Sequence, residues 1–214
     1  MSKSLNNAID PVELVNSYGL DPVRYFLLRE VPFGNDGDFQ RRALIGRLNA
    51  DLANAYGNLC QRVLSIIAKN CGEKVPVKGT LIAADTALLD RAKALLAIVR
   101  AEIDEQAFHR ALASIWEVIA DANRYVDAQA PWALAKTDPA RRDTVMWVLA
   151  ETIRRVTLLV QPFMPQSAAR ILDQLAVPAG GRVFSAFDTE LAAGTLLPKP
   201  QGVFPRYVEP KAAA

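Results

Sequence analysis

The sequence is poor in the residues that most often carry metal or nucleophilic chemistry. Its 214 residues include one histidine, His109, and two cysteines, Cys60 and Cys71. A structural zinc site needs about four cysteine or histidine ligands, so we expect no metal site. Two cysteines in a chain of this length do not indicate a disulfide scaffold. A catalytic triad and a phosphate-binding P-loop are also missing, so we expect no complete active site, and His109 should be a hydrogen-bonded residue on a helix flank.

The sequence also has little excess charge and no long apolar run. The net charge is only +2, whereas proteins that bind nucleic acid mainly through phosphates are strongly basic. Any RNA recognition by this chain must therefore depend on a few well-placed side chains. No stretch of about 20 apolar residues is present, which predicts no transmembrane helix. The first residues lack the apolar core of a signal peptide, and we expect a cytoplasmic protein.

The apolar residues that are present, 51% of the chain, recur at helical spacing. Intervals of three and four residues are typical of amphipathic helices that bury one face. The predicted fold class is all-α: an antiparallel helical bundle of four to five helices, with an N-terminal short-helix segment and an irregular C-terminal tail. Long helices are expected over residues 40–70, 106–128, 139–160 and 166–175, and another after a break at residues 72–79, with an apolar face from Leu88 to Ile103.

Two short helices are predicted ahead of the bundle. Asp10 precedes Pro11 and is a suitable N-cap, and Gly19 is a suitable helix end. Asp21 precedes Pro22 and repeats the same start signal for the second short helix. A loop rich in glycine, asparagine and aspartate follows at residues 33–39 and marks the expected boundary to the bundle.

The first forty residues resemble one enzyme family. Residues 1–4, Met-Ser-Lys-Ser, are similar to the last four residues of the KMSKS signature of class I aminoacyl-tRNA synthetases. Residues 19–30 resemble the helix that follows in methionyl enzymes, and residues 32–39 resemble their PFGQDGDF segment. The similarity continues through residues 57–59, 129–132 and 204–206. The sequence is identified as a member of the bacterial-type methionyl-tRNA synthetase family.

The resemblance implies an organisation for the chain. In the family the Rossmann core, the HIGH signature and the zinc-bearing insertion precede the KMSKS signature, so we expect the carboxy-terminal part of a methionine–tRNA ligase. Residues 1–38 would be the remnant of the KMSKS loop with connecting helices, 39–175 the anticodon-binding bundle, and 176–214 a tail that packs back on it. Lys3 aligns with the lysine that helps bind the triphosphate of ATP (with Mg) in the complete enzyme. This part alone should need no cofactor and should be inactive; its expected partners are the anticodon loop of tRNA(Met) and the missing catalytic domain.

Three residues match the anticodon-reading positions of the family. Asn58 and Arg62 lie four residues apart and therefore on one helix face. Arginine offers only donors and asparagine offers both donors and acceptors, so the pair suits the edge of an unstacked base. Trp132 follows a helix-breaking proline and could stack on a base. Without the resemblance, the pair would be read as a solvated helix face and Trp132 as a packing anchor.

Other candidates are assigned to structural roles. Trp116 and Trp147 lie within helical periodicity and are expected in the core. The double arginines at residues 141–142 and 154–155 could contact phosphates but are more typical of solvated faces. Two alternative functions stay open: the anticodon-binding domain of a related synthetase for leucine, isoleucine, valine or cysteine, and a helical protein-interaction scaffold.

Overall fold

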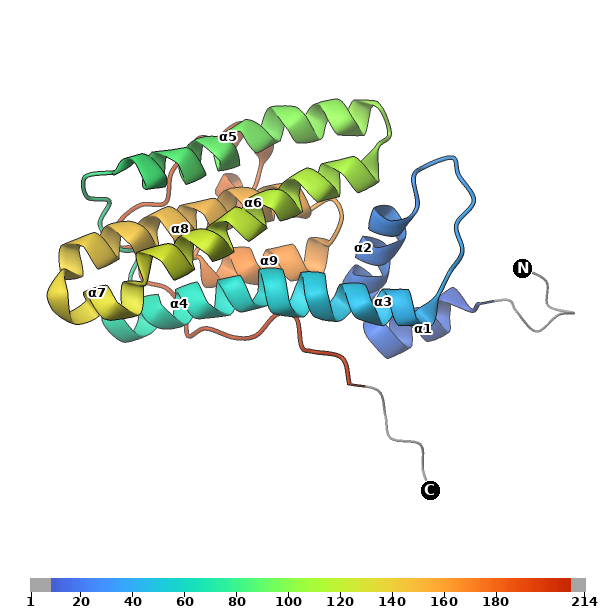
Figure 1. Cartoon of the computed structure of the whole chain (residues 1–214), viewed down its shortest axis with the longest axis horizontal. Helices are drawn as coiled ribbons and strands as arrows, with labels where there is room; N and C mark the ends of the chain where they lie inside the picture. Colours follow the sequence, from blue (N-terminus) through green and yellow to red (C-terminus); the bar gives the residue numbers. More distant parts are fainter. Residues whose placement is uncertain (1–8, 209–214) are drawn as a thin grey trace, which may run out of the picture.

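The computed structural model describes residues 9–208 and shows a bundle of long helices with two short helices at one end (Figure 1). Neighbouring long helices run in opposite directions, and no β-strand occurs within the described part of the chain. The predicted all-α antiparallel bundle is confirmed. The elements are α1 (Pro11–Tyr18), α2 (Leu20–Glu30), α3 (Arg41–Arg47), the π-helical segment η2 (Leu48–Gly57), α4 (Asn58–Asn70), α5 (Ala83–Asp104), α6 (Phe108–Gln129), α7 (Pro131–Thr137), α8 (Pro139–Val160), α9 (Pro165–Gln174), and the short 3-10 helices η3 (Ala179–Gly181) and η4 (Phe184–Ala186).

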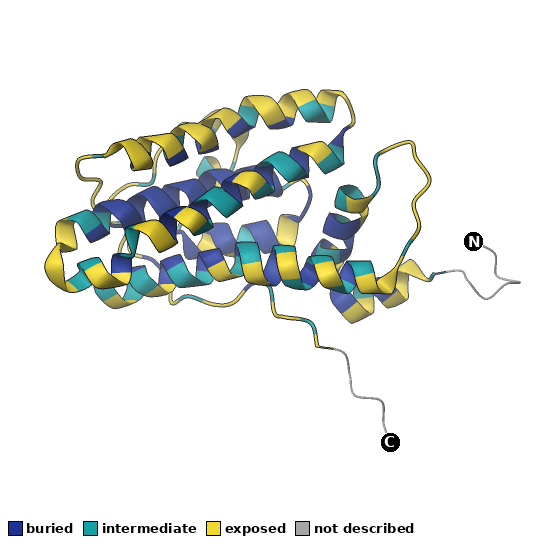
Figure 2. Cartoon of the chain, in the orientation of Figure 1, coloured by how far each residue is buried: buried dark blue, intermediate teal, exposed yellow. Residues whose placement is uncertain are grey.

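Helix α8 is the central element of the bundle. Every residue from Thr144 to Val160 is buried, and Figure 2 shows this helix enclosed by the others. Most of these residues are apolar, as expected for a helix buried on all sides, and Trp147, only 1% exposed, confirms its predicted place in the core. α8 therefore serves as the fixed element against which the outer helices pack.

The N-terminal short helices are built around one glycine. Asp10 caps α1 by accepting a hydrogen bond from the Val12 N–H, as predicted. Gly19, with φ of 88°, both ends α1 and precedes α2, and such a positive φ favours glycine. The predicted start of α2 at Asp21 is wrong. The Asp21 carboxylate is buried and accepts instead from the Ser167 N–H in the first turn of α9, so it ties the short helices to the bundle.

The tail after α9 packs along the bundle without forming long helices. Its buried side chains are Val177, Phe187, Leu197 and Val203. Its backbone also pairs with the loop between α4 and α5, because the Val75 N–H donates to the Thr195 carbonyl and the Leu197 N–H donates to the Glu73 carbonyl, each at 2.8 Å. These contacts bring residues near the C-terminus back to the end of α4.

Candidate nucleic-acid interface

The helix that carries Asn58 and Arg62 is continuous from α3 to α4, but its central segment η2 is π-helical. A π segment leaves some carbonyl groups outside the usual α-helical pattern. Two carbonyls of η2 accept hydrogen bonds from α6: the Trp116 indole N–H reaches Asp51 O and the Asn123 amide reaches Ala55 O, each at 3.3 Å. These bonds fix η2 against α6 and thereby fix the direction in which the first turns of α4 face.

Gly57, the last residue of η2, has no room for a side chain. A Cβ there would lie 2.8 Å from the Leu52 carbonyl oxygen and 3.2 Å from the Phe204 Cβ. Gly46 in α3 has nothing within 4 Å. We expect Gly57→Ala to lower the free energy of unfolding by about 1–2 kcal/mol because overpacking outweighs the gain in helix propensity. Gly46→Ala should raise it by about 0.5–1 kcal/mol. Denaturant unfolding measures both, and equal stability of the two variants would contradict the expectation.

Trp132 lies at the start of α7 and is presented to solvent. The chain leaves α6 through Ala130, whose φ of 43° places it in the left-handed region, and Pro131 then begins α7. The Trp132 side chain is 51% exposed. A large aromatic ring left this accessible on a folded domain is available for stacking.

Arg62 connects the two predicted elements of the site. Its guanidinium carbon lies 5.4 Å from the centroid of the Trp132 ring, within the range of a cation–π contact. Its Nη2 atom also donates to the Asp127 carboxylate at 2.7 Å. The structure therefore places Arg62 and Trp132 side by side, although they come from α4 and α7. Asp127 was not predicted, because no local pattern links it to a partner 65 residues away.

Asn58 is exposed one helical turn before Arg62. Among residues 9–208 no hydrogen bond engages its side chain, so the oxygen and the amino group of its amide are both available to a ligand. Asn58 also lines an open groove of about 440 Å³ between the long helix and the tail. The other residues lining this groove are Ala53, Asn54, Gly57, Gln61, Gly202, Val203, Phe204 and Arg206.

Several of the remaining expectations can be compared with the structure. Lys3 lies outside the described residues. Trp116 is half-buried and stacks on Tyr25 with a centroid distance of 4.5 Å, as expected for a core residue. His109 is half-buried on α6, but its Nδ1 atom has no hydrogen-bond partner within the described part of the chain, so the expectation of a satisfied histidine is wrong.

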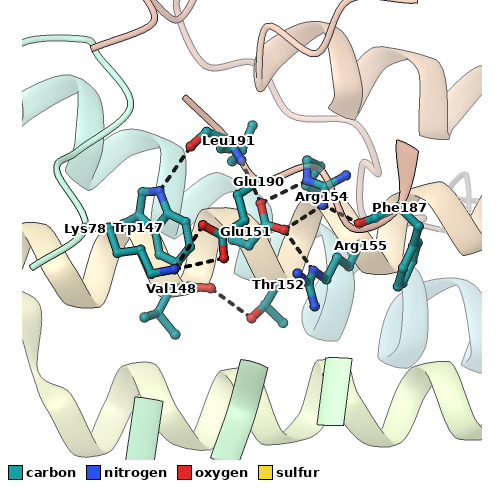
Figure 3. Close-up of polar contacts among 10 residues, drawn as sticks. All are labelled: Lys78, Trp147, Val148, Glu151, Thr152, Arg154, Arg155, Phe187, Glu190 and Leu191. Atoms are coloured by element: carbon teal, nitrogen blue, oxygen red, sulfur yellow. Dashed lines mark hydrogen bonds and ion pairs between the residues drawn. The ribbon is translucent and has the colours of Figure 1, made fainter. Parts of the chain in front are cut away.

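The double arginines are not solvated. Arg154 and Arg155 are buried and both donate to the carboxylate of Glu151 (Figure 3). Arg141 is half-buried and binds Asp85, and Arg142 is buried beside Asp143. The reason is geometric, since α8 is surrounded by other helices and its polar residues need partners inside the protein. These arginines therefore do not form part of an exposed basic surface.

Comparison with known proteins identifies the family of this chain. Residues 75–212 match the family described as the anticodon binding domain of methionyl tRNA ligase. The chain belongs to this family. Residues 1–64 match the family described as tRNA synthetases class I (M). The methionyl-tRNA ligase resemblance inferred from the motifs is thereby confirmed.

Individual relatives agree with the methionyl-tRNA ligase family. The methionine–tRNA ligase of Brucella suis is 59% identical over 210 residues, covering 98% of this chain and 41% of the relative. That of Mesorhizobium japonicum is 57% identical over 211 residues. Methionyl-tRNA synthetase of Mycobacterium tuberculosis, 50% identical, superposes with a TM-score of 0.92 in its free form and 0.94 in complex with methionyl-adenylate. The chain thus spans about two fifths of the length of these relatives, 41% in the first case.

Proposed function

We propose that this chain binds the CAU anticodon of tRNA(Met) through Trp132, Arg62 and Asn58, as part of a methionine–tRNA ligase. The observation that supports the proposal most directly is the position of Arg62 over the Trp132 ring, 5.4 Å from its centroid, with Trp132 half exposed. One base can stack on the indole while the guanidinium and the Asn58 amide reach its edge. Recognition of unstacked bases by stacking and edge contacts is the usual way in which RNA loops are read.

The donor pattern favours cytosine as the stacked base. Arg62 offers donors only, and cytosine presents acceptors at O2 and N3. Uracil carries an N–H at position 3, which would oppose an arginine donor. Asn58 can accept from the cytosine amino group through its amide oxygen. The pair therefore discriminates between the first bases of CAU and UAU.

The complete enzyme would supply what this part lacks. In this proposal residues 39–175 hold the anticodon loop, while the catalytic domain activates methionine with ATP and Mg and joins it to the tRNA. Residues 1–38, with Lys3 in the ATP-binding loop, would connect the two, and the tail from residue 176 would support the bundle. The reaction belongs in the cytoplasm. No helix among residues 9–208 has the length and apolar character needed to cross a membrane.

The proposal is tested by binding of this chain to two anticodon stem-loops that differ only in the first anticodon base. At low salt we expect the CAU stem-loop to bind about 5- to 150-fold more tightly than the UAU stem-loop, because a correctly paired base edge contributes about 1–3 kcal/mol. Low salt is needed because the chain has little net positive charge. Equal affinity for both RNAs would contradict anticodon reading, and absence of binding to either would favour the protein-interaction scaffold.

A further inference from the structure

The helix that presents Trp132 has little apolar anchoring of its own. α7 has seven residues, of which only Pro131 is fully buried, while Leu134 is half-buried against the core. Helices this short are not stable in isolation and normally take their orientation from a buried apolar face. With so small an apolar face, the orientation of α7, and with it the direction of the Trp132 ring, should also depend on contacts made at its two ends.

Both ends of α7 are joined through the guanidinium of Arg141. Gln129 is the last residue of α6, directly before the turn into α7, and Arg141 lies in the first turn of α8, directly after it. The Nη2 atom of Arg141 donates to Gln129 Oε1 at 2.7 Å. The segment that contains all of α7 is thus closed by a side-chain hydrogen bond that spans 12 positions in the sequence.

The Arg141 guanidinium is itself fixed by a buried carboxylate. Its Nη1 and Nη2 atoms donate to the two oxygens of Asp85 at 2.6 Å and 2.7 Å, which is a bidentate pair. Asp85 is 0% exposed and also accepts from the Tyr125 hydroxyl at 2.6 Å. We refer to Asp85, Tyr125, Gln129 and Arg141 as the Arg141 cluster.

The charge state of the Arg141 cluster is stable. Burial raises the pKa of the Asp85 carboxyl, but the hydrogen bonds from Arg141, Tyr125 and the Ile82 N–H outweigh this and hold the pKa below its usual value. The carboxylate therefore keeps its charge at neutral pH and keeps the guanidinium in one place. Because Arg141 donates three hydrogen bonds within the protein, it is not available as a phosphate ligand.

We propose that the Arg141 cluster is a positioning device that sets the orientation of Trp132 for the anticodon base. From the α4 side, Arg62 contacts Trp132 in α7 and Asp127 near the end of α6, and the Arg141 cluster holds the same segment from the side of α5 and α8. Gln129 is the link in this cluster that acts on the α6–α7 turn. The inference rests on the proposed function of Trp132 in base stacking.

The test uses two substitutions at Gln129 that differ in one property. Gln129→Met keeps the size of the side chain and removes the acceptor, whereas Gln129→Glu keeps an acceptor for Arg141. We expect Gln129→Met to weaken binding of the CAU stem-loop by about tenfold, the value of one hydrogen bond to a charged group. We expect Gln129→Glu to bind as the unmodified chain does. The matched control is Arg110→Met, which removes the Arg110–Glu102 hydrogen bond at the opposite end of α6.

A second readout follows Trp132 directly and needs no RNA. Acrylamide quenching of Trp132 fluorescence is obtained by subtracting the signal of a Trp132→Phe chain, which retains Trp116 and Trp147. We expect Gln129→Met to change the quenching constant of Trp132, and Gln129→Glu and Arg110→Met to leave it unchanged.

The outcomes separate this inference from the proposed function. If the unmodified chain does not distinguish CAU from UAU, the proposed function fails, while quenching still reports whether the Arg141 cluster positions Trp132. Unchanged quenching in Gln129→Met would overturn the inference. A loss of CAU binding of the same size in Gln129→Glu or Arg110→Met would also overturn it, because the effect would then not depend on the acceptor at Gln129.

Discussion

Replacing Trp132 with alanine is expected to weaken binding of the CAU stem-loop by roughly 5- to 150-fold, since stacking of a base on an aromatic side chain contributes about 1–3 kcal/mol. The free energy of unfolding should change by no more than about 0.5 kcal/mol, because the Trp132 side chain is 51% exposed and contributes little to the core. A large change in affinity with a small change in stability distinguishes a ligand-binding tryptophan from a packing anchor. Equilibrium RNA binding and denaturant unfolding of the same preparations measure the two quantities.

The matched control for this substitution is Trp132→Phe, which keeps an aromatic face and should retain most of the affinity. A second control is Trp116→Phe, which removes the indole N–H that donates to Asp51 O at 3.3 Å. That variant should lose stability at the π segment without losing the stacking platform. If Trp132→Ala binds the CAU stem-loop as tightly as the unmodified chain, Trp132 does not stack on the anticodon.

The long helices were predictable because their signal is local. The apolar spacing over residues 40–70 and the Pro139 start signal correspond to continuous helix from Arg41 to Asn70 and to α8 beginning at Pro139. Spacing of apolar residues did not reveal the π segment, whose carbonyls bind side chains of α6 more than 60 residues away in the sequence. Asp21 was likewise misread from local sequence. Its position before Pro22 predicts a helix N-cap, but its carboxylate accepts from Ser167, which is far away in the sequence.

The candidate site was predictable only in part, for a similar reason. Asn58 and Arg62 share a helix face by spacing alone, and the exposure of Trp132 follows from its place after Pro131. The proximity of Arg62 to Trp132 depends on how α4 packs beside α7. The hydrogen bonds from Arg62 to Asp127 and from Arg141 to Asp85 join residues on different helices, and no sequence pattern predicts them. The double arginine at residues 154–155 was expected on a solvated face. Both side chains are instead buried and neutralise the carboxylate of Glu151.

The buried carboxylate of Glu151 is the residue whose loss should destabilise the fold most. One oxygen accepts from Arg154 at 2.6 Å and from Arg155 at 2.8 Å, and the other accepts from the Leu191 N–H at 3.1 Å (Figure 3). Arg154 additionally donates to the Phe187 carbonyl at 2.7 Å. Glu151 therefore compensates two buried positive charges and also connects α8 to the tail.

Glu151→Leu is expected to lower the free energy of unfolding by about 3–5 kcal/mol, since it leaves two arginines buried without a counter-charge. This is a large share of the roughly 5–15 kcal/mol that stabilises an ordinary domain. The control is Lys78→Met, which breaks the partly exposed pair with Glu190 on the same side of α8 and should cost no more than about 1 kcal/mol. Denaturant unfolding measures both variants.

A combined variant identifies the cause of that loss. If the cost of Glu151→Leu arises from uncompensated charge, then adding Arg154→Met and Arg155→Met should recover part of the stability, because an apolar replacement of a whole buried ion cluster is often neutral or stabilising. If the triple variant is less stable than Glu151→Leu alone, the contacts of the two arginines with Phe187 carry the stability instead: the hydrogen bond from Arg154 to the Phe187 carbonyl and the position of Arg155 over the Phe187 ring. The principal role of Glu151, Arg154 and Arg155 would then be to hold the tail against α8. The tail also supplies Phe204, which lies beside Gly57, the residue directly before Asn58.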